Sequence, residues 1–264
     1  MNYFWLPSPI KAEIKRVLRA CLKARDWYAG GSPEPLLLLG HIRSGSTLLH
    51  HLLVSHPEII GCGERKVRYQ SSIDFDQLRV DVHLRRGQLL RWHRYVTDQV
   101  NHNDWLASEA LLNHPQVRTI FLIREPCASV ASMLSMTSVG GMTAEDAIRY
   151  YRDRLSTLSR YAQIIQEPAR AFLLTYDDLI INTELTLQSL QCFLGLQTKL
   201  TDHYQTFNFT GIRGDPSPHI HAGRILRDIP RRRIVLDPAI LASLLDVYQD
   251  CRQVLQKHCL SPTS

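Results

Sequence analysis

Residues 35–47 read Pro-Leu-Leu-Leu-Leu-Gly-His-Ile-Arg-Ser-Gly-Ser-Thr, and this stretch decides the predicted fold. Its apolar start has the length and composition of a short strand that is buried on both faces, which is typical of parallel sheets. A turn rich in glycine and serine follows. We then expect a short helix from Thr47 to about Ser55, which His56-Pro57 would end. A buried strand, a tight loop and a helix form the opening unit of an α/β fold.

Further apolar runs alternate with helical patterns along the rest of the chain. We predict strands over 58–62, 117–123 and 171–174, and helices over 74–96, 126–135, 143–167 and 183–194. Because strands and helices alternate, we expect a central, mainly parallel sheet with helices on both faces. The predicted fold class is therefore α/β, in a P-loop-like three-layer α/β/α arrangement.

The predicted organisation is a single domain over 1–264 whose core spans about 35–195. A basic amphipathic helix over 8–28 precedes this core. Residues 208–233 form a long segment rich in glycine, proline and arginine, and a helix over 237–259 follows it. The two terminal helices are therefore expected as additions to the α/β core.

The sequence also excludes several classes of protein. No apolar run approaches the ~20 residues of a membrane span, and no apolar stretch after the first charges indicates a cleavable signal. The six cysteines form no C-x-x-C pair, and no pattern of interleaved aromatic and basic residues indicates nucleic-acid binding. We therefore expect a cytoplasmic protein with reduced cysteines.

The turn at residues 40–47 has the spacing of a phosphate-binding loop, G-x-x-x-x-G-K-[ST], with Ser46 in place of the lysine. In such a loop, backbone N–H groups and the start of the following helix bind an anion. Here Arg43 supplies the positive charge from inside the loop. The residues expected to hold the anion are Arg43, Ser44, Gly45, Ser46 and Thr47. Because the lysine is missing, the loop is not typical of ATP or GTP enzymes that use Mg²⁺.

A second candidate element lies at residues 118–126, where an apolar strand runs into Arg-Glu-Pro. Arg124 would stand just past the carboxyl end of this strand, at the edge where open α/β sheets bind ligands. Ser132 follows eight residues later, about two turns along the helix that begins near Pro126. Arg124 and Ser132 would together hold a monophosphate. A wider excess of arginine favours an anionic ligand, because 25 of the 31 basic residues are arginine and the net charge is +6.

Together the two elements resemble the sulfotransferases that use 3′-phosphoadenylyl sulfate (PAPS). In that family a loop R-[SG]-[GS]-[ST]-T after the first strand binds the 5′-phosphosulfate, and an R-x-P-x-x-x-x-x-S element binds the 3′-phosphate. Both elements occur here in the same order, at 43–47 and 124–132. His56-Pro57-Glu58, Gly63-Glu64 and residues 173–179 look like the carbohydrate and tyrosylprotein branch of the family. The resemblance covers the whole of the predicted core.

The resemblance implies transfer of a sulfuryl group from PAPS to an acceptor hydroxyl, without a metal. Arg43 and the loop N–H groups would hold the 5′-phosphosulfate, and Arg124 with Ser132 would hold the 3′-phosphate. The segment from 208 to 233 resembles the family's late loop, which folds over the nucleotide. Its candidates for contact with the 3′-phosphate or adenine are Arg213, Ser217 and Arg224, the alternative being a solvated basic loop. The acceptor would be a carbohydrate, a lipid or a small hydroxyl compound.

Chain topology nominates Glu64 as the general base. The helix after Thr47 runs away from the loop by roughly 15 Å, and the strand over 58–62 returns by about the same distance. Glu64 would then emerge at the sheet edge that carries Arg43. In similar tyrosylprotein enzymes a glutamate just after this Cys-Gly step is the base. The alternatives are a surface glutamate paired with an arginine, and His41 as the base instead.

One position departs from the family pattern. Similar enzymes often carry a lysine near the transferring group, in a short segment before the strand of Arg124. Gln99 occupies the comparable place, and the candidates to replace the lysine are His102, Arg91 and Arg94. The departure bears on the catalytic rate more than on donor binding.

Two other functions stay open at this point. A phosphotransferase with a degenerate nucleotide loop would need Mg²⁺-dependent ATP binding and a carboxylate at a strand end, for which Glu125 is the candidate. A non-catalytic protein that binds adenosine 3′,5′-bisphosphate would explain Gln99. A metal site made of Asp215, His219 and His221 has too few ligands, so we predict no metal.

Overall fold

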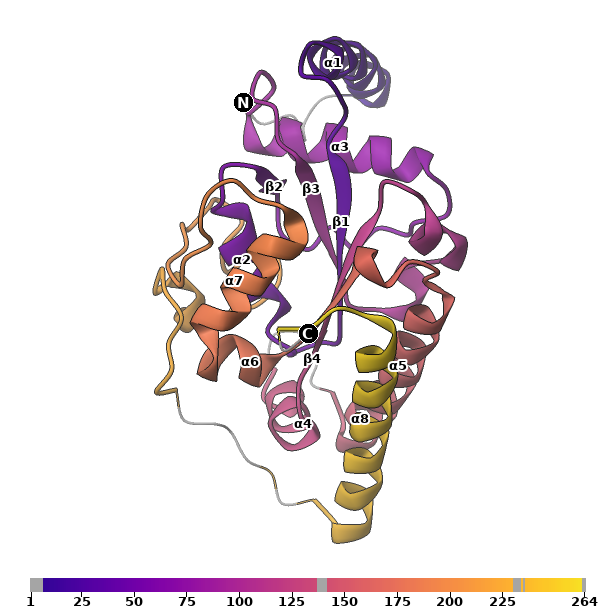
Figure 1. The fold of residues 1–264 in the computed structure, drawn as a ribbon, viewed down its shortest axis with the longest axis vertical. Helices are drawn as coiled ribbons and strands as arrows, with labels where there is room; N and C mark the ends of the chain where they lie inside the picture. Colours follow the sequence, from indigo (N-terminus) through magenta and orange to yellow (C-terminus); the bar gives the residue numbers. More distant parts are fainter. Residues whose placement is uncertain (1–6, 137–141, 230–233, 235, 263–264) are drawn as a thin grey trace.

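The computed structural model describes residues 7–136, 142–229, 234 and 236–262 (Figure 1). Within these residues the centre is a five-stranded sheet in the order β2-β3-β1-β4-β5, and every pairing is parallel. The strands are β1 (Glu34–Gly40), β2 (Ile59–Gly61), β3 (Tyr95–Val100), β4 (Arg118–Ile123) and β5 (Ala171–Thr175). The predicted parallel sheet is confirmed.

Helices cover both faces of this sheet (Figure 1). One face carries α2 (Ser46–Val54), α6 (Tyr176–Ile181) and α7 (Thr183–Leu194). The other face carries α5 (Ala144–Ile164) and α8 (Pro238–His258), which pack against each other and against α4 (Pro126–Leu134). The three-layer α/β/α fold class predicted from the sequence is therefore confirmed.

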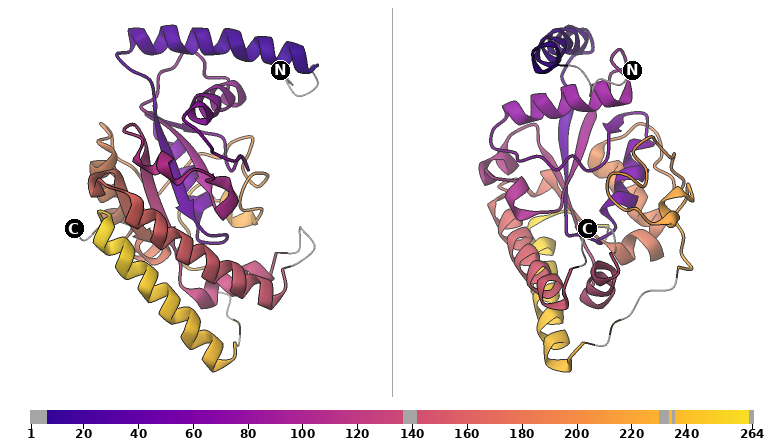
Figure 2. Two further views of the ribbon diagram at one scale, coloured as in Figure 1. Left: turned by 90° about the vertical axis from the view of Figure 1, so that its right-hand side faces the viewer. Right: turned by 180° about the vertical axis from the view of Figure 1, so that it is seen from behind.

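Two further helices, α1 (Ser8–Tyr28) and α3 (Ile73–Arg86), lie across the end of the sheet at which β1 and β3 begin (Figure 2). Leu18 and Leu22 of α1 pack with Val80 of α3 in an apolar cluster separate from the main core. α1 has the bounds that its amphipathic pattern predicted. Because the strands run away from this end, α1 lies far from their carboxyl ends.

The apolar run that predicted the first strand forms the middle of the core. The four leucines of β1, Leu36 to Leu39, are each at most 1% exposed, because β3 and β4 flank the strand and helices cover both faces. A strand that is covered on both faces needs no polar alternation, which is why its sequence is continuously apolar.

The main difference from prediction is β3. The helix predicted over 74–96 ends at Arg86, where Gly87 takes a φ of 64° and terminates it. Tyr95–Val100 then form β3, although no strand was predicted there. Its middle residues, Thr97, Asp98 and Gln99, are polar and yet at most 1% exposed. Polar residues of this kind interrupt the apolar run by which a buried strand is recognised.

The position of β3 decides which residues meet at the carboxyl edge of the sheet. β3 lies between β2 and β1, with Val100 paired to Leu39. Asn101, the residue after β3, therefore follows the strand beside Gly40. The ends of β2 and β4 reach the same edge, because all these strands are parallel. The loops that leave this edge hold the residues considered next.

Candidate active site

The loop between β1 and α2 is a tight turn that leads directly into a helix. Arg43 has a φ of 66° and Gly45 a φ of 96°, so the chain turns sharply before α2 begins at Ser46. A Cβ on Gly45 would lie 2.6 Å from the Tyr176 ring, so this position requires glycine. No side chain caps α2, whereas Glu125 caps α4 by accepting bonds from two of its N–H groups. An uncapped helix start within a tight loop favours an anion.

Arg43 makes the main side-chain contacts of the loop. Its Nε donates to Ser132 Oγ at 2.8 Å, and its Nη1 forms an ion pair with Asp215 Oδ1 at 2.8 Å. Ser217 donates to Asp215 from both N–H and Oγ, and the Asp215 N–H donates to Thr47 Oγ1 at 2.9 Å. Burial opposes ionisation of Asp215, but Arg43 and Ser217 outweigh it and hold the Asp215 pKa below its ordinary value. Two predicted site residues, Arg43 and Ser217, thus bind the Asp215 carboxylate. Two more lie beside them, since Ser132 bonds Arg43 and Thr47 bonds the Asp215 backbone.

Arg124 lies beside this loop, at the end of β4. Its Nη1 donates to the Arg43 carbonyl oxygen at 3.2 Å, and its guanidinium lies 4.0 Å from the centre of the Tyr176 ring. The hydroxyl of Ser132, which was expected to act together with Arg124, accepts its hydrogen bond from Arg43. The side chains of Arg124 and Ser132, the two residues of the second sequence element, therefore both contact Arg43.

His41 has a structural place in the loop. Its Nδ1 donates to the Ile42 carbonyl at 2.8 Å, and its Nε2 accepts from the Arg124 N–H at 3.1 Å. The ring is completely buried, and burial lowers the His41 pKa to about 4. Because both ring nitrogens are occupied, His41 is not placed to take a proton from an acceptor. The structure does not support the prediction of His41 as an alternative base.

Glu64 reaches the same edge from the end of β2. Its Oε1 accepts a hydrogen bond from Asn101 Nδ2 at 2.9 Å, and the same Nδ2 donates to Ser46 Oγ at 3.2 Å. The structure therefore places Glu64 one side chain away from the loop, at the edge that the topology indicated. The alternative ion pair of Glu64 with Arg43 or Arg65 is not found in the described part of the chain, where both arginines pair with aspartates.

Three side chains of α5 hold these loops, and the sequence analysis missed them. Tyr150 Oη accepts from the Ile42 N–H at 2.8 Å and donates to the Asn101 carbonyl at 2.6 Å. Arg154, which is completely buried, donates to the carbonyl oxygens of Gly40 and Val100, at the ends of β1 and β3. Tyr151 Oη donates to the Arg124 carbonyl at 2.6 Å. The only signal in the sequence was that polar groups share the buried face of a helix.

The structure places two of the three candidates to replace the lysine that the family often carries away from the site. Gln99 is buried in β3, and neither amide atom has a hydrogen-bond partner among the described residues. Arg91 and Arg94 precede β3 and so lie at the opposite edge, where Arg94 donates to the Gly195 carbonyl. The expectation that either arginine replaces the lysine is therefore wrong. His102, next to Asn101, remains at the site edge.

The three candidates of the late loop lie in different places. Ser217 adjoins Arg43 through Asp215. Arg213 packs on Gly63, the residue before Glu64, since a Cβ on that glycine would lie 2.7 Å from the Arg213 Cβ. Arg224 is exposed, and its backbone pairs with His203 rather than with the loop around Arg43. The end of the predicted loop, 230–233, lies outside the described residues.

Two carboxylates considered as metal ligands, Asp215 and Glu125, have other partners in the structure. Among the residues that are described, no three histidine, cysteine, aspartate or glutamate side chains gather as a metal would require. Asp215 is bound to Arg43, and Glu125 accepts hydrogen bonds from the N–H groups of Cys127 and Ala128 at 2.8 Å. The carboxylate that a magnesium-dependent phosphotransferase would use is therefore occupied as a helix cap.

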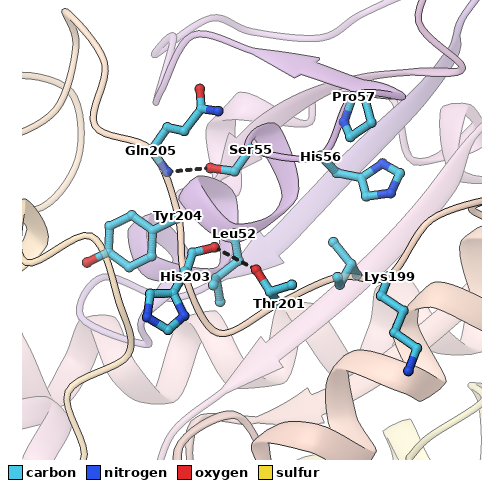
Figure 3. Close-up of a pocket in the computed structure, with 10 residues that line it drawn as sticks. Leu52, Ser55, His56, Pro57, Lys199, Thr201, His203, Tyr204 and Gln205 are labelled. Atoms are coloured by element: carbon cyan, nitrogen blue, oxygen red, sulfur yellow. Dashed lines mark hydrogen bonds between the residues drawn. The ribbon is translucent and has the colours of Figure 1, made fainter.

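A cavity of about 290 Å³ lies at the other end of α2 (Figure 3). Its lining includes Ser55, His56, Lys199, Thr201 and His203. Ser55 Oγ accepts from the Gln205 N–H at 2.8 Å, so part of this polar lining is already paired. The length of α2 separates this cavity from the loop around Arg43, which lies at the first turn of the helix. The cavity is therefore not part of the candidate active site.

In the helices described, no segment is long and apolar enough to cross a membrane.

Comparison with known proteins gives one match to a family model. Residues 75–200 match the model of the sulfotransferase family. The matched range is slightly less than half of the chain; it contains Arg124 and Ser132 but begins after Glu64 and the loop around Arg43. The match does not separate the carbohydrate and tyrosylprotein branch from others. No curated protein sequence matches the chain.

Solved structures agree with the fold. The sulfotransferase domain of the olefin synthase from Synechococcus PCC 7002 is 20% identical, with a TM-score of 0.58, over 84% of this chain and 94% of that one. The sulfotransferase domain from the curacin biosynthetic pathway is 17% identical, with a TM-score of 0.55, over 81% of this chain and 98% of that one. These likenesses establish the fold shared with sulfotransferase domains.

Proposed function

We propose that this chain is a PAPS-dependent sulfotransferase, which moves a sulfuryl group from PAPS to an acceptor hydroxyl. One observation carries the proposal. The loop around Arg43, which has an arginine and no lysine, lies one side chain away from the carboxylate of Glu64. Asn101 joins the two, because its amide bonds both Ser46 of the loop and Glu64. The family match over 75–200 and the fold support the same conclusion.

In this proposal the loop binds the sulfated end of the donor. The first N–H groups of α2, the hydroxyls of Ser46 and Thr47, and the Arg43 guanidinium receive the 5′-phosphosulfate. Arg124 and Ser132 receive the 3′-phosphate, which requires Ser132 to exchange its bond with Arg43 for one with the donor. Ser217 and Arg224 of the late loop are the further contacts proposed for the nucleotide, Arg224 only after a movement of that loop.

The proposed reaction is an in-line displacement at sulfur. The acceptor oxygen forms a bond to sulfur while the bond between sulfur and the 5′-phosphate oxygen breaks. Glu64 takes the acceptor proton, and adenosine 3′,5′-bisphosphate leaves with the electron pair. Arg43 and the loop N–H groups stabilise the charge that develops on the leaving phosphate. The design uses protein cations for this purpose, and no metal is part of the proposal.

The acceptor is proposed only as a class, that of hydroxyl compounds such as a carbohydrate, a lipid or a small molecule. A second candidate function, non-catalytic binding of adenosine 3′,5′-bisphosphate, is favoured by one observation. Gln99 stands in place of the expected lysine, with a buried amide that has no partner among the described residues. Such a protein would keep the anion loop and lose the transfer.

Two measurements test the proposal. Calorimetry should show that adenosine 3′,5′-bisphosphate binds more tightly than ATP, without a requirement for Mg²⁺. Incubation with ³⁵S-labelled PAPS should transfer label to one member of a panel containing a phenol, a long-chain alcohol, a monosaccharide and a hydroxylated peptide, or to an extract of the source cells. Preferential, Mg²⁺-dependent ATP binding would overturn the proposal. Nucleotide binding without transfer to any acceptor would support the non-catalytic alternative.

A further inference from the structure

The amide of Asn101 uses both of its hydrogens at the candidate site. Nδ2 donates to Glu64 Oε1 at 2.9 Å and to Ser46 Oγ at 3.2 Å. Asn101 is 5% exposed, so its bond to Ser46 is buried and its bond to Glu64 is partly buried. Glu64 comes from the end of β2 and Ser46 from the first turn of α2. In the described structure, Asn101 therefore links these two segments by hydrogen bonds to both of them.

Asn101 is itself held at its backbone carbonyl and packed beneath the loop. Its carbonyl oxygen accepts from Tyr150 Oη at 2.6 Å, and Tyr150 also binds the Ile42 N–H of the loop. Its Oδ1 lies under the loop, 3.3 Å from where a Cβ of Gly40 would stand. Because Gly40 has no side chain, the amide fits beneath the loop with Nδ2 turned toward Glu64. The asparagine therefore has little freedom to change its orientation.

We infer that Asn101 is a positioning residue for the proposed reaction, which holds the Glu64 carboxylate at a fixed place relative to the donor loop. The inference rests on the proposed function. Oε1 of Glu64 is held by the amide, while Oε2 has no hydrogen-bond partner within the described residues and is the oxygen left to accept the proton of the acceptor. The Ser46 hydroxyl, on the other side of the same amide, belongs to the proposed donor site.

The chemistry of an amide suits this role. A carboxylate that serves as a base must be oriented, yet a neighbouring cation would stabilise its charged form and make it a weaker base. An amide donates a hydrogen bond without bringing a net charge. Placement errors of about 1 Å cost on the order of 100-fold in rate, so a single orienting bond has a measurable effect.

A double-mutant cycle tests the inference. The variants are Asn101→Ala, Glu64→Ala and the double variant, and each is assayed with ³⁵S-labelled PAPS. We expect Asn101→Ala to lower kcat by about 10- to 100-fold and to change the KM for PAPS by less than about 3-fold. In the Glu64→Ala background the same change should cost nothing further, because Asn101 acts through Glu64. Losses that multiply would overturn the inference.

Two more variants separate positioning from folding. Asn101→Asp keeps the shape of the side chain and removes both donors, so its kcat should fall at least as far as that of Asn101→Ala. Asn113→Ala is the matched control, since Asn113 also makes two amide hydrogen bonds, to Ile164 and Gln166, but lies outside the site. Asn113→Ala should leave kcat unchanged. An Asn101→Asp variant with normal kcat would contradict the inference.

The cycle is also measured by unfolding in urea, which does not depend on activity. Non-additive unfolding free energies for Asn101→Ala and Glu64→Ala support the tie between the two residues, and additive ones overturn it. If the unmodified chain transferred no label from PAPS, the proposed function would be wrong. The unfolding cycle would still show whether Asn101 and Glu64 interact. If the chain were active and Glu64→Ala inactive, normal activity in both Asn101 variants would overturn only the inference.

Discussion

Arg43 and Asp215 form an ion pair of 2.8 Å at the place where we propose that the sulfated phosphate of the donor binds. The two residues lie far apart in sequence, and the contact brings the late loop onto the first turn of α2. Gly214 makes this possible, because a Cβ there would lie 2.4 Å from Thr47 Oγ1. The carboxylate of Asp215 therefore binds the guanidinium that, in our proposal, an anionic ligand would bind.

Replacement of this carboxylate should strengthen nucleotide binding. In Asp215→Asn the guanidinium of Arg43 no longer has a charged protein partner, so the anion of the ligand has less competition. We expect the Kd for adenosine 3′,5′-bisphosphate to fall by about 3- to 10-fold in calorimetry, which corresponds to the roughly 1 kcal/mol of a partly exposed ion pair. Asp228→Asn, the same change of charge at an exposed position, is the control. Weaker binding in Asp215→Asn would show instead that Asp215 is needed to orient Arg43.

Loss of Arg43 itself should abolish donor binding. The Arg43→Ala variant removes the one cation that the sequence places inside the anion loop, and with it the hydrogen bond to Ser132. We expect the Kd for adenosine 3′,5′-bisphosphate to rise by at least about 100-fold, because charge-assisted bonds to phosphate are among the strongest in proteins. Arg16→Ala, on the exposed face of α1, should bind normally. Near-normal affinity and turnover in Arg43→Ala would rule out the loop as the donor site.

Glu64→Gln should separate binding from chemistry. Glutamine keeps an oxygen that can accept the hydrogen bond from Asn101 but cannot take a proton. We expect transfer of ³⁵S to fall by about 10²- to 10⁴-fold, as is usual when a general base is lost, while the calorimetric Kd for the nucleotide stays unchanged. Glu145→Gln at the exposed start of α5 provides the matched control. Normal transfer by Glu64→Gln would place the base elsewhere.

Local sequence was sufficient to predict the tight turn between β1 and α2 and most helices. The loop from Gly40 to Thr47 has a fixed spacing between a buried strand and a helix, and the backbone of such a unit follows from neighbouring residues. Glu64 was also placed at the right edge by chain length alone, since a helix leading away and a strand leading back cover similar distances.

Contacts between distant segments could not be predicted in this way. β3 was missed because Thr97, Asp98 and Gln99 are buried by the strands and helices around them, which a polar sequence does not reveal. Asn101 acquires its role only when β3 stands beside β1. The pair of Arg43 with Asp215 depends on how the late loop folds back, and no local pattern reports that path.

Stability should depend on pH through His41. Burial lowers its pKa to about 4, below the ordinary value of about 6.5 that it has in the unfolded chain. Between pH 4 and pH 6.5 the folded state therefore binds fewer protons than the unfolded state. The stability that neutral His41 contributes is thus complete above about pH 6.5 and is lost as the pH falls toward 4. The loss reaches up to about 3 kcal/mol at the acid end, at 1.36 kcal/mol per pKa unit.

Urea unfolding of the His41→Gln variant between pH 7.5 and pH 4 measures this contribution. Glutamine does not titrate. Its side-chain oxygen can accept the hydrogen bond that the Arg124 N–H donates to His41 Nε2. The variant should be less stable than the unmodified protein at pH 7.5 and lose less stability on acidification. Its curve should be shallower but not flat, because burial also lowers the pKa of His83 to about 4 and of His93 to about 3. His219→Gln, at an exposed position, is the control and should leave the slope of unfolding free energy against pH unchanged. Equal slopes for His41→Gln and the unmodified protein would contradict a buried, neutral His41.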